Sequence, residues 1–471
     1  MKHETEGTRA DRVGQVQITF TNKQRTAWGG ACSVVAKFRE RIGFREWVLE
    51  QVPVEEHAPN AKGIYEKVLA LLLTSLTGGT RFSHLAWRGH GREALQACFE
   101  VEWLPQATSV LTRFLGKFRQ KHNERLRTAS VGLAGRLIEA EGIREDNLVL
   151  DRTVGERYGA QEGARKGYNP KKPGRPSHHP LKAGLGCGYV VNLWNRRGDT
   201  HSAHQAVEFY DQTRQELPRG LVIRWVLCDS GFGEEGFGEH LEAESQPYIV
   251  ALRLTAGVQQ AIRGIRQWKE WDKGLEGAER TVTLSTWKKA RRLVVIRPHV
   301  PTRPEATGKQ PLLFRELEEH KAYRYSVWVT NETTLPPEDI WRTYRPRANE
   351  ENVIKERKEG YGWHEFNVRS FWGTEAAMLR IGMVCYNLVH PLNRCVLKTV
   401  DEGVARLKTL RLKVLAIPAV YGSGGRRPPL RLGVQDRSLR AQIRYWLHRI
   451  HALELRLFNC NAVAVSAAAP G

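Results

Sequence analysis

Apolar residues recur at helical spacing in the first third of the chain and at strand spacing beyond it. The stretches GACSVVAKFRERIGF and GIYEKVLALLLTSLTGG place apolar residues three or four positions apart, which predicts helices. Further on, the shorter runs DNLVLDRT, GLVIRWVLCDSGFG and PYIVALRL predict strands, and HSAHQAVEFYDQTRQEL predicts a helix among them. TEAAMLRIGMVCYNLVHPLNRCVLK is apolar on nearly all sides, which predicts a buried helix. Near-continuous apolar strands alternating with helices predict an α/β fold with a covered central sheet.

These changes of pattern divide the chain into four regions. Residues 1–145 form a mostly helical region, and residues 146–255 together with 335–398 form the α/β core. Residues 256–334 are basic, dotted with tryptophan and strand-rich, and they separate the two parts of the core. Residues 399–471 form a basic C-terminal region.

Residues 93–118 carry a possible helix-turn-helix. A short helix, a turn at WLP and a second helix beginning at QATSVL give the required order of elements. The second helix would present Arg113 and Lys117 to DNA. An ordinary helical hairpin explains the same pattern equally well, so both interpretations stay open.

The charge of the chain indicates a polyanionic partner. Lys and Arg outnumber Asp and Glu by 73 to 51, which gives a formal net charge of +22 and a pI near 9.9. Nucleic acid is a better candidate for this partner than a membrane surface is. No apolar run is long enough to cross a bilayer, and the first residues lack the apolar segment of a signal peptide. We therefore expect a cytoplasmic protein that acts on nucleic acid and not on membranes.

The cysteines and histidines give no sign of a soft-metal site. The seven cysteines are scattered and no pair has zinc-ligand spacing, which favours small core residues in a reducing compartment. His178 and His179 fall in a basic loop without a partner at ligand spacing. We expect these two histidines to be solvated.

The stretch YRPRANEENVIKERKEGYG concentrates charges in a predicted helix. At about 100° per residue, one face about 60° wide carries Tyr344, Arg347, Glu351 and Lys358, whereas Glu350 points away. The proline belongs in a first turn, so Tyr344 is expected just before the regular helix. The alternative is a solvated helix whose charges pair three and four residues apart.

Three carboxylates suggest chemistry when they are taken together. Asp151 and Asp229 each end a predicted strand, where functional groups collect, and Glu351 lies on the later helix. A single aspartate at such a place is more often a cap or turn residue. Gathered together, the three would repel one another and require cations, which is the arrangement of a two-metal phosphoryl-transfer site. Mg²⁺ suits carboxylate oxygens, and Mn²⁺ can substitute for it.

The chain resembles a family of mobile-element enzymes. The spacing of Tyr344, Arg347, Glu351 and Lys358 matches the Y-(2)-R-(3)-E-(6)-K signature of bacterial insertion-sequence transposases. LVLDRTV, LCDSGFGEEGF and YGAQEGARKGYNPKKPGRPSHHPLKAG resemble the thirteen-eighty family of insertion sequences, which are distant relatives of piggyBac. Arg152 is a departure, because relatives often carry a small residue after the first aspartate.

The resemblance implies an RNase H-like catalytic core with a DDE triad, and an insertion domain, residues 256–334, between the second aspartate and the glutamate. It also implies roles for individual residues. The implied metal ligands for two Mg²⁺ ions are Asp151, Asp229 and Glu351. The implied contacts to the phosphates of the transposon end are Tyr344, Arg347 and Lys358. Hairpin formation, where it occurs, needs an aromatic ring that holds an unstacked base, and the insertion offers Trp268, Trp271, Trp287 and Trp328, each of which is also a reasonable core residue.

The implied function is cut-and-paste DNA transposition in the bacterial cytoplasm, at the nucleoid when the protein is bound to DNA. The partners would be terminal inverted repeats and target DNA, handled by a homodimer on paired ends. Two alternatives are a catalytically inactive, transposase-derived DNA-binding protein and a metal-dependent nuclease without strand transfer. All three carboxylates are present, which favours an active enzyme.

The loop GYNPKKPGRPSHHP is basic and stiffened by proline. Its Lys171, Lys172 and Arg175 surround a GRP core that resembles minor-groove hooks, in which arginine enters the narrow groove of A·T-rich DNA. The alternative is a solvated surface loop.

Overall fold

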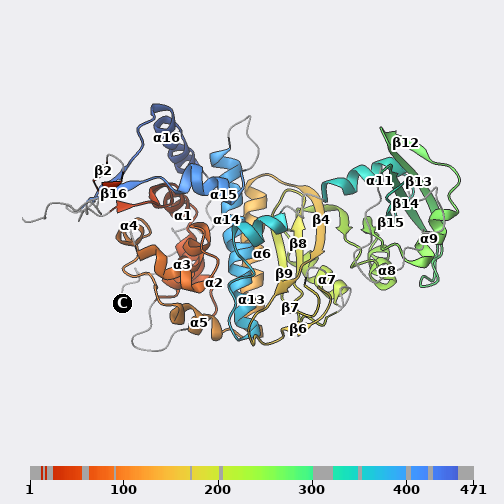
Figure 1. The fold of residues 1–471 in the computed structure, drawn as a ribbon, viewed down its shortest axis with the longest axis horizontal. Helices are drawn as coiled ribbons and strands as arrows, with labels where there is room; N and C mark the ends of the chain where they lie inside the picture. Colours follow the sequence, from red (N-terminus) through yellow and green to blue (C-terminus); the bar gives the residue numbers. More distant parts are fainter. Residues whose placement is uncertain are drawn as a thin grey trace, which may run out of the picture.

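The computed structural model describes residues 12–13, 16–17, 25–55, 63–89, 92–169, 172–200, 205–300, 322–347, 353–398, 405–422 and 428–453. A mixed sheet runs from the middle of the molecule to one end, and helices fill the other end (Figure 1). Among the described residues, no helix combines the length and apolar character that a membrane span requires.

The main sheet has nine strands in the order β12-β13-β14-β15-β11-β10-β4-β8-β9. Strand β10 runs parallel to both β4 and β11, and the other neighbouring pairs are antiparallel. The strands are β4 (Glu145–Arg152), β8 (Leu181–Leu185), β9 (Val190–Trp194), β10 (Val222–Cys228), β11 (Tyr248–Ala251), β12 (Lys269–Asp272), β13 (Leu275–Val282), β14 (Arg291–Pro298) and β15 (Ser326–Thr330). The carboxyl ends of β4 and β10 therefore meet at one edge of the sheet.

The strands of the predicted insertion continue this sheet. Strand β15 bonds to β11 on one side and to β14 on the other, so β12–β15 extend the core sheet edgewise. Three helices connect or flank these strands: α8 (Glu235–Ala243), α9 (Ala256–Arg263) and α11 (Pro337–Tyr344). Helix α7 (Ala206–Glu216) links β9 to β10 and packs against α8.

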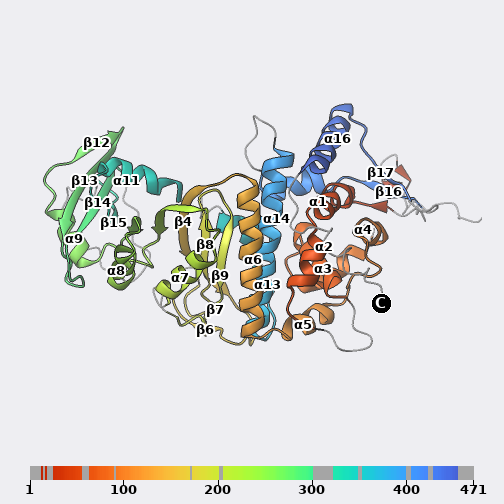
Figure 2. The same ribbon diagram turned by 180° about the vertical axis from the view of Figure 1, so that it is seen from behind.

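One long helical segment lies, together with α6 (Gln120–Ala140), between the sheet and the N-terminal helices that precede α6 (Figures 1 and 2). It consists of α13 (Phe371–Leu379), a π turn (Arg380–Cys385), α14 (Tyr386–Pro391) and a second π turn (Leu392–Leu397). Residues 376–384 are almost fully buried, because the segment packs against α3 (Ile64–Leu76), α5 (Thr108–Gly116), α6 and β9. The predicted buried helix is confirmed.

The beginning and end of the chain fold together. β3 (Arg25–Thr26) pairs with β16 (Ala419–Tyr421), which pairs with β17 (Leu430–Leu432), and α16 (Arg437–Ala452) packs on α1. Figures 1 and 2 both show these red and blue segments side by side. The remaining elements here are β1 (Arg12–Val13), β2 (Val16–Gln17), a π turn (Ala31–Val35), α1 (Ala36–Arg41), α2 (Phe44–Gln51), α3 (Ile64–Leu76), a 3₁₀ helix (Phe82–Gly89), α4 (Arg92–Cys98), α5 (Thr108–Gly116), α6 (Gln120–Ala140), α15 (Leu407–Leu410) and a π turn (Arg411–Leu415).

Candidate active site

Two of the predicted acids meet at the edge of the main sheet. The register of β4 and β10 pairs Leu150 with Cys228, so the next residues along each strand, Asp151 and Asp229, lie side by side. Neighbouring strands are about 4.8 Å apart. Asp151 is buried, whereas Asp229 is partly exposed. Both carboxylates therefore lie at one place although 77 residues separate them in the sequence.

Each carboxylate is held by one arginine and one backbone amide. Arg347 Nη2 lies 3.3 Å from Asp151 Oδ2, and Arg152 Nε lies 3.7 Å from Asp229 Oδ2. The backbone N–H of Arg152 donates to Asp151 Oδ1 at 2.7 Å, and that of Gly231 donates to Asp229 Oδ1 at 2.9 Å. A Cβ on Gly231 would lie 2.8 Å from Arg152 Nε, so glycine leaves room for the arginine.

Burial makes the first carboxylate difficult to ionise. It raises the pKa of Asp151 to about 6; the Arg347 charge opposes this rise and the Asp229 charge adds to it. The Lys182 ammonium also favours the charged form. Lys182 lies directly opposite Asp151 on β8 and is 2% exposed. Sequence reasoning missed this buried cation, because LKAGL sits in a glycine-rich stretch that does not look like a strand.

The described residues of the signature surround the same edge. The Tyr344 hydroxyl donates to the Cys228 carbonyl at 2.9 Å, and Lys358 Nζ donates to the Val154 carbonyl at 3.1 Å. Arg347 pairs with Asp151. Glu351, like its neighbour Glu350, lies outside the described residues.

The signature does not lie on one regular helix. Helix α11 begins at Pro337, with Glu338 and Asp339 in its first turn, and ends at Tyr344. A 3₁₀ turn (Arg345–Arg347) follows, because Pro346 has no N–H to continue the helical bonds. A π turn (Glu356–Gly360) contains Lys358. Tyr344 thus closes α11 and precedes the helical turn that contains Lys358, while residues 348–352 lie outside the described residues.

The basic loop folds back onto neighbouring strands. Lys172 Nζ lies 2.7 Å from Glu156 Oε2, and the Arg175 guanidinium lies 4.7 Å from the centre of the Tyr158 ring. The next residues form β7 (Pro176–His178), which pairs with β5 (Gly155–Glu156) and β6 (Arg165–Lys166). Lys172 and Arg175 remain exposed, while Lys171 lies outside the described residues.

The two histidines after this loop are buried, so the expectation of solvated side chains is wrong. His178 is 0% exposed and His179 is 3% exposed. The Arg157 Nε–H donates to His178 Nδ1 at 3.0 Å, and His178 Nε2 lies 2.9 Å from the Glu162 carbonyl. Burial, with the Arg157 charge, lowers the pKa of His178 to about 4. Because β7 pairs with β5 and β6 in a small sheet, His178 and His179 lie in the interior of the protein.

The two helices of the possible helix-turn-helix have different neighbours. Helix α4 packs against the π turn 31–35 and β3, whereas α5 packs against α3, the 3₁₀ helix 82–89 and α13. Arg113 and Lys117 are exposed at α5. Arg113 lines an open groove of about 1120 Å³ together with Arg119 and Arg369. DNA binding by this segment stays a prediction.

The four tryptophans of the insertion lie in packed surroundings. Trp287 and Trp328 are buried, and the Trp328 ring lies 5.4 Å from the ring of Tyr344. Trp268 and Trp271 are partly buried. The burial of Trp287 and Trp328 agrees with core positions.

A separate cluster of metal-binding residue types links α7 to α8. The ligand atoms of Asp211, His240 and Glu244 lie within 4.8 Å of one another. His240 Nε2 lies 2.6 Å from Asp211 Oδ1, so direct contacts already satisfy part of the cluster.

Comparison with known proteins identifies the family of the chain. The family described as transposase DDE domain group 1 matches residues 14–454. The chain belongs to this family. The transposase has no match among curated proteins. Among solved structures, it is similar to a piggyBac transposase in a synaptic complex with hairpin DNA, with 11% identity, a TM-score of 0.42, and coverage of 82% of this chain and 78% of that chain.

Proposed function

We propose that this DDE transposase performs cut-and-paste excision and integration of an insertion sequence of the thirteen-eighty type, with Asp151, Asp229 and Glu351 as its catalytic carboxylates. The observation that carries the proposal is the adjacency of Asp151 and Asp229 at the ends of parallel strands. The strand segment β9-β8-β4-β10-β11 would be the RNase H-like core. Its support is the mixed sheet with two acids at one edge.

The donor set of this edge fits Mg²⁺. Carboxylate oxygens are the ligands that Mg²⁺ prefers. Burial, with a smaller contribution from the Asp229 charge, raises the pKa of Asp151 to about 6, and a cation bound beside this carboxylate would stabilise its charged form. When bound, two Mg²⁺ ions, or Mn²⁺ in their place, would supply activation of a nucleophile and charge neutralisation at phosphorus. Asp151, Asp229 and Glu351 would hold them. The Asp211–His240–Glu244 cluster includes an imidazole and suits Mg²⁺ less well.

The basic residues at this edge would position DNA. Arg347 is buried against Asp151, and Tyr344 and Lys358 donate to backbone carbonyls at the ends of the strands. These bonds keep the three side chains beside the acids, where they would contact phosphates of the transposon end. The net charge of +22 supports binding of terminal inverted repeats and target DNA. A homodimer would hold the paired ends.

The two alternatives are a catalytically inactive DNA-binding protein and a nuclease without strand transfer. The arrangement around the acids favours an active enzyme over the first. Each aspartate keeps an oriented carboxylate, fixed by a backbone N–H, and Gly231 leaves room for Arg152. The second alternative shares the same acids and differs only in its products.

The test is cleavage of DNA that carries the sequences flanking the gene, in Mg²⁺. Asp151→Asn and Asp229→Asn should each lower cleavage by at least about a hundredfold, while DNA binding is kept. Asp146→Asn is the control, because Asp146 lies on the same strand at the opposite edge of the sheet. Normal cleavage by both variants would contradict the proposal. Joining of a 3′-hydroxyl end to target DNA separates a transposase from a nuclease.

A further inference from the structure

Helices α7 and α8 form the two connections of β10, the strand that ends next to Asp229. α7 precedes β10 in the chain and α8 follows it. The two helices pack against each other, and Figures 1 and 2 both show them side by side. Part of their contact is apolar, because the ring centres of Tyr210 and Phe237 are 6.0 Å apart. A cluster of metal-binding residue types completes the contact.

The cluster consists of Asp211, His240 and Glu244. Asp211 lies on α7, His240 lies on α8, and Glu244 directly follows α8. Asp211 Oδ1 is 2.6 Å from His240 Nε2, and Glu244 Oε1 is 3.8 Å from the same nitrogen. Asp211 and His240 are partly exposed and Glu244 is exposed, so an ion and its water ligands can reach all three from solvent.

The cluster lies toward the edge of the sheet that is opposite Asp229. β10 and β11 are parallel, so α8 begins after the carboxyl end of β10 and returns the chain to the amino end of β11. His240 and Glu244 lie at the end of α8, shortly before β11 begins. The cluster is therefore separate from the acidic edge, and an inference about it does not depend on the proposed function.

The separations within the cluster suit a tetrahedral ion. Ligand atoms that are each about 2.0–2.1 Å from such an ion lie about 3.3 Å from one another. The observed separations of 2.6 and 3.8 Å fall on either side of this value, and rotation of exposed side chains can adjust both. His240 and Glu244 are four residues apart, which places them on one face of the helix. A neutral imidazole binds a metal through Nε2 when its proton is on Nδ1.

A buried tyrosine positions two of the three ligands. Tyr210 is 0% exposed, and its hydroxyl donates to Glu244 Oε2 at 3.2 Å. This bond leaves Glu244 Oε1 as the oxygen near His240. The rings of Tyr210 and His240 meet edge to face, with their centres 5.9 Å apart. Hydrogen bonds that orient a ligating carboxylate are typical of the surroundings of metal sites.

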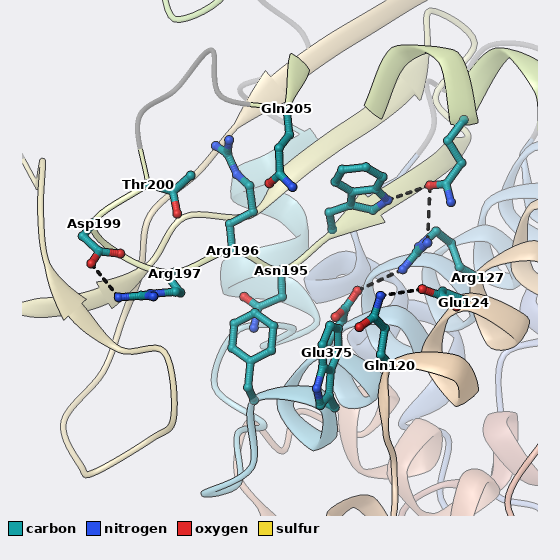
Figure 3. Close-up of a pocket in the computed structure, with 14 residues that line it drawn as sticks. Gln120, Glu124, Arg127, Asn195, Arg196, Arg197, Asp199, Thr200, Gln205 and Glu375 are labelled. Carbon is teal, nitrogen blue, oxygen red and sulfur yellow. Dashed lines mark hydrogen bonds and ion pairs between the residues drawn. The ribbon is translucent and has the colours of Figure 1, made fainter. Parts of the chain in front are cut away.

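The helix that carries the third ligand is fixed to the sheet. Gln212 Oε1, on α7, accepts from the Trp194 indole N–H at 2.6 Å. Arg127, which lies beside Glu375 (Figure 3), donates to the same oxygen of Gln212 at 3.4 Å. Successive helical side chains point about 100° apart, so Asp211 projects from a fixed helix, and its carboxylate meets His240 of α8.

The negative charge of the cluster is incompletely balanced. Three other acids of α8 each pair with an arginine or a lysine: Glu235, Glu239 and Glu242. Within the described part of the chain, the ion pairs of Asp211 and Glu244 are with His240 alone. Arg214, one turn after Asp211, is exposed to solvent. Two carboxylates therefore face one imidazole, and a bound divalent cation would balance them.

We propose that Asp211, His240 and Glu244 bind one Zn²⁺ ion, or a related transition-metal ion, which ties α7 to α8. An imidazole nitrogen and carboxylate oxygens are ligands that Zn²⁺ accepts, whereas Mg²⁺ prefers oxygen alone. Water completes the coordination of the ion. The bound ion stabilises the fold, because it joins the helical connections before and after β10.

The test measures binding of Co²⁺, which accepts the ligands of Zn²⁺ and absorbs visible light. The full, metal-free chain is titrated in excess Mg²⁺, which competes for the acidic edge. One Co²⁺ per chain should bind without the thiolate charge-transfer band that cysteine ligands produce, and Zn²⁺ should displace it. Loss of an outer partner costs about 10–100-fold in metal affinity. His240→Ala and Glu244→Gln should therefore weaken binding at least about a hundredfold, and Tyr210→Phe about tenfold.

Zn²⁺ should also raise the unfolding temperature of the wild type and not that of His240→Ala, because it binds the folded state. The matched controls are Glu208→Gln, an exposed acid of α7, and His448→Ala, an exposed histidine of α16. Both should bind Co²⁺ as the wild type does.

Absence of Co²⁺ binding would overturn the proposal, as would binding that His240→Ala and Glu244→Gln leave unchanged. Binding that is lost in Asp229→Asn and kept in His240→Ala would place the ion at the acidic edge, which also overturns it. Failure of Asp151→Asn to lower DNA cleavage would instead refute the proposed function and would leave Co²⁺ binding at α7 and α8 as a separate result.

Discussion

Arg152, the residue next to Asp151, pairs with Asp229: its Nε lies 3.7 Å from Asp229 Oδ2. The same guanidinium lies 5.3 Å from the centre of the Tyr168 ring, so it contacts two groups at the rim of the site. A cation bound to Asp229 would compete with this pair. Arg152→Ser should therefore tighten Mg²⁺ binding, by up to about fivefold for a partly exposed ion pair, as measured by calorimetry on the metal-free protein.

Arg152→Lys should leave Mg²⁺ affinity close to that of the wild type, since it keeps the charge. Arg224→Ser is the control variant, because Arg224 pairs with Glu145 at the far end of the neighbouring strands. Unchanged Mg²⁺ affinity in Arg152→Ser would show that the arginine does not compete with the metal.

Much of the main sheet was predictable from apolar runs. β4, β10 and β11 are short, apolar and bounded by turn residues, so their pattern alone indicates strands. β8 was missed because LKAGL contains a lysine and two small residues, and it is buried on all five positions only because β4 and β9 flank it. The joining of β12–β15 to the core sheet and the pairing of β3 with β16 are long-range contacts that leave no local pattern.

The basic loop offers a test by salt dependence. Replacing Lys171, Lys172 and Arg175 together with Ala should weaken DNA binding and lower the slope of log affinity against log salt, because fewer counterions are released. The magnitude of this slope should fall by about two units and not by three, because Lys172 is already paired with Glu156. Lys269→Ala with Lys273→Ala, exposed at the outer strand β12, is the control. An unchanged slope would mean that the loop does not contact phosphates.

Helix α5 is the second predicted DNA contact. Arg113→Ala with Lys117→Ala in the full chain should lower the preference for end DNA over random DNA at matched salt, by about tenfold if one base contact is lost. The full chain is required, because the 1–145 segment pairs through β3 with β16. Arg125→Ala, exposed on α6, is the control. If the wild type and the Arg113→Ala with Lys117→Ala variant prefer end DNA equally, α5 does not read the DNA sequence.

Glu375 predicts a dependence of stability on pH. Burial raises its pKa from 4.5 to about 7, against the opposing effect of Arg127. Because the folded-state pKa is the higher one, the stabilisation is complete below pH 4.5 and is lost as the pH rises through about 7. The wild type should lose about 3 kcal/mol of unfolding free energy across this range relative to Glu375→Gln. Urea titrations of both proteins at the two ends of this pH range measure the unfolding free energies. An equal change of unfolding free energy in the wild type and in Glu375→Gln would contradict the prediction.

The site was only partly predictable, for reasons of geometry. Asp151 and Asp229 could be paired from the sequence because functional groups at the ends of parallel strands share an edge. Lys182 could not be added to them, because a lysine among small residues shows no sign of burial, and its place opposite Asp151 arises only from the register of β4 and β8. Regular helical geometry failed after Tyr344, where Pro346 ends the α-helix.

The third carboxylate decides whether the signature is aligned correctly. Glu351→Gln keeps the size of the side chain and removes one negative charge from the proposed metal site, so Mg²⁺-dependent cleavage and strand transfer should fall by at least about a hundredfold. DNA binding should be kept or strengthened, because repulsion of phosphate decreases. Glu350→Gln is the adjacent control and should cut almost normally. Loss of cleavage in Glu350→Gln with normal cleavage in Glu351→Gln would show that Glu350 is the catalytic residue and that the signature is misaligned. Normal cleavage by both variants would show that this segment is not part of the active site.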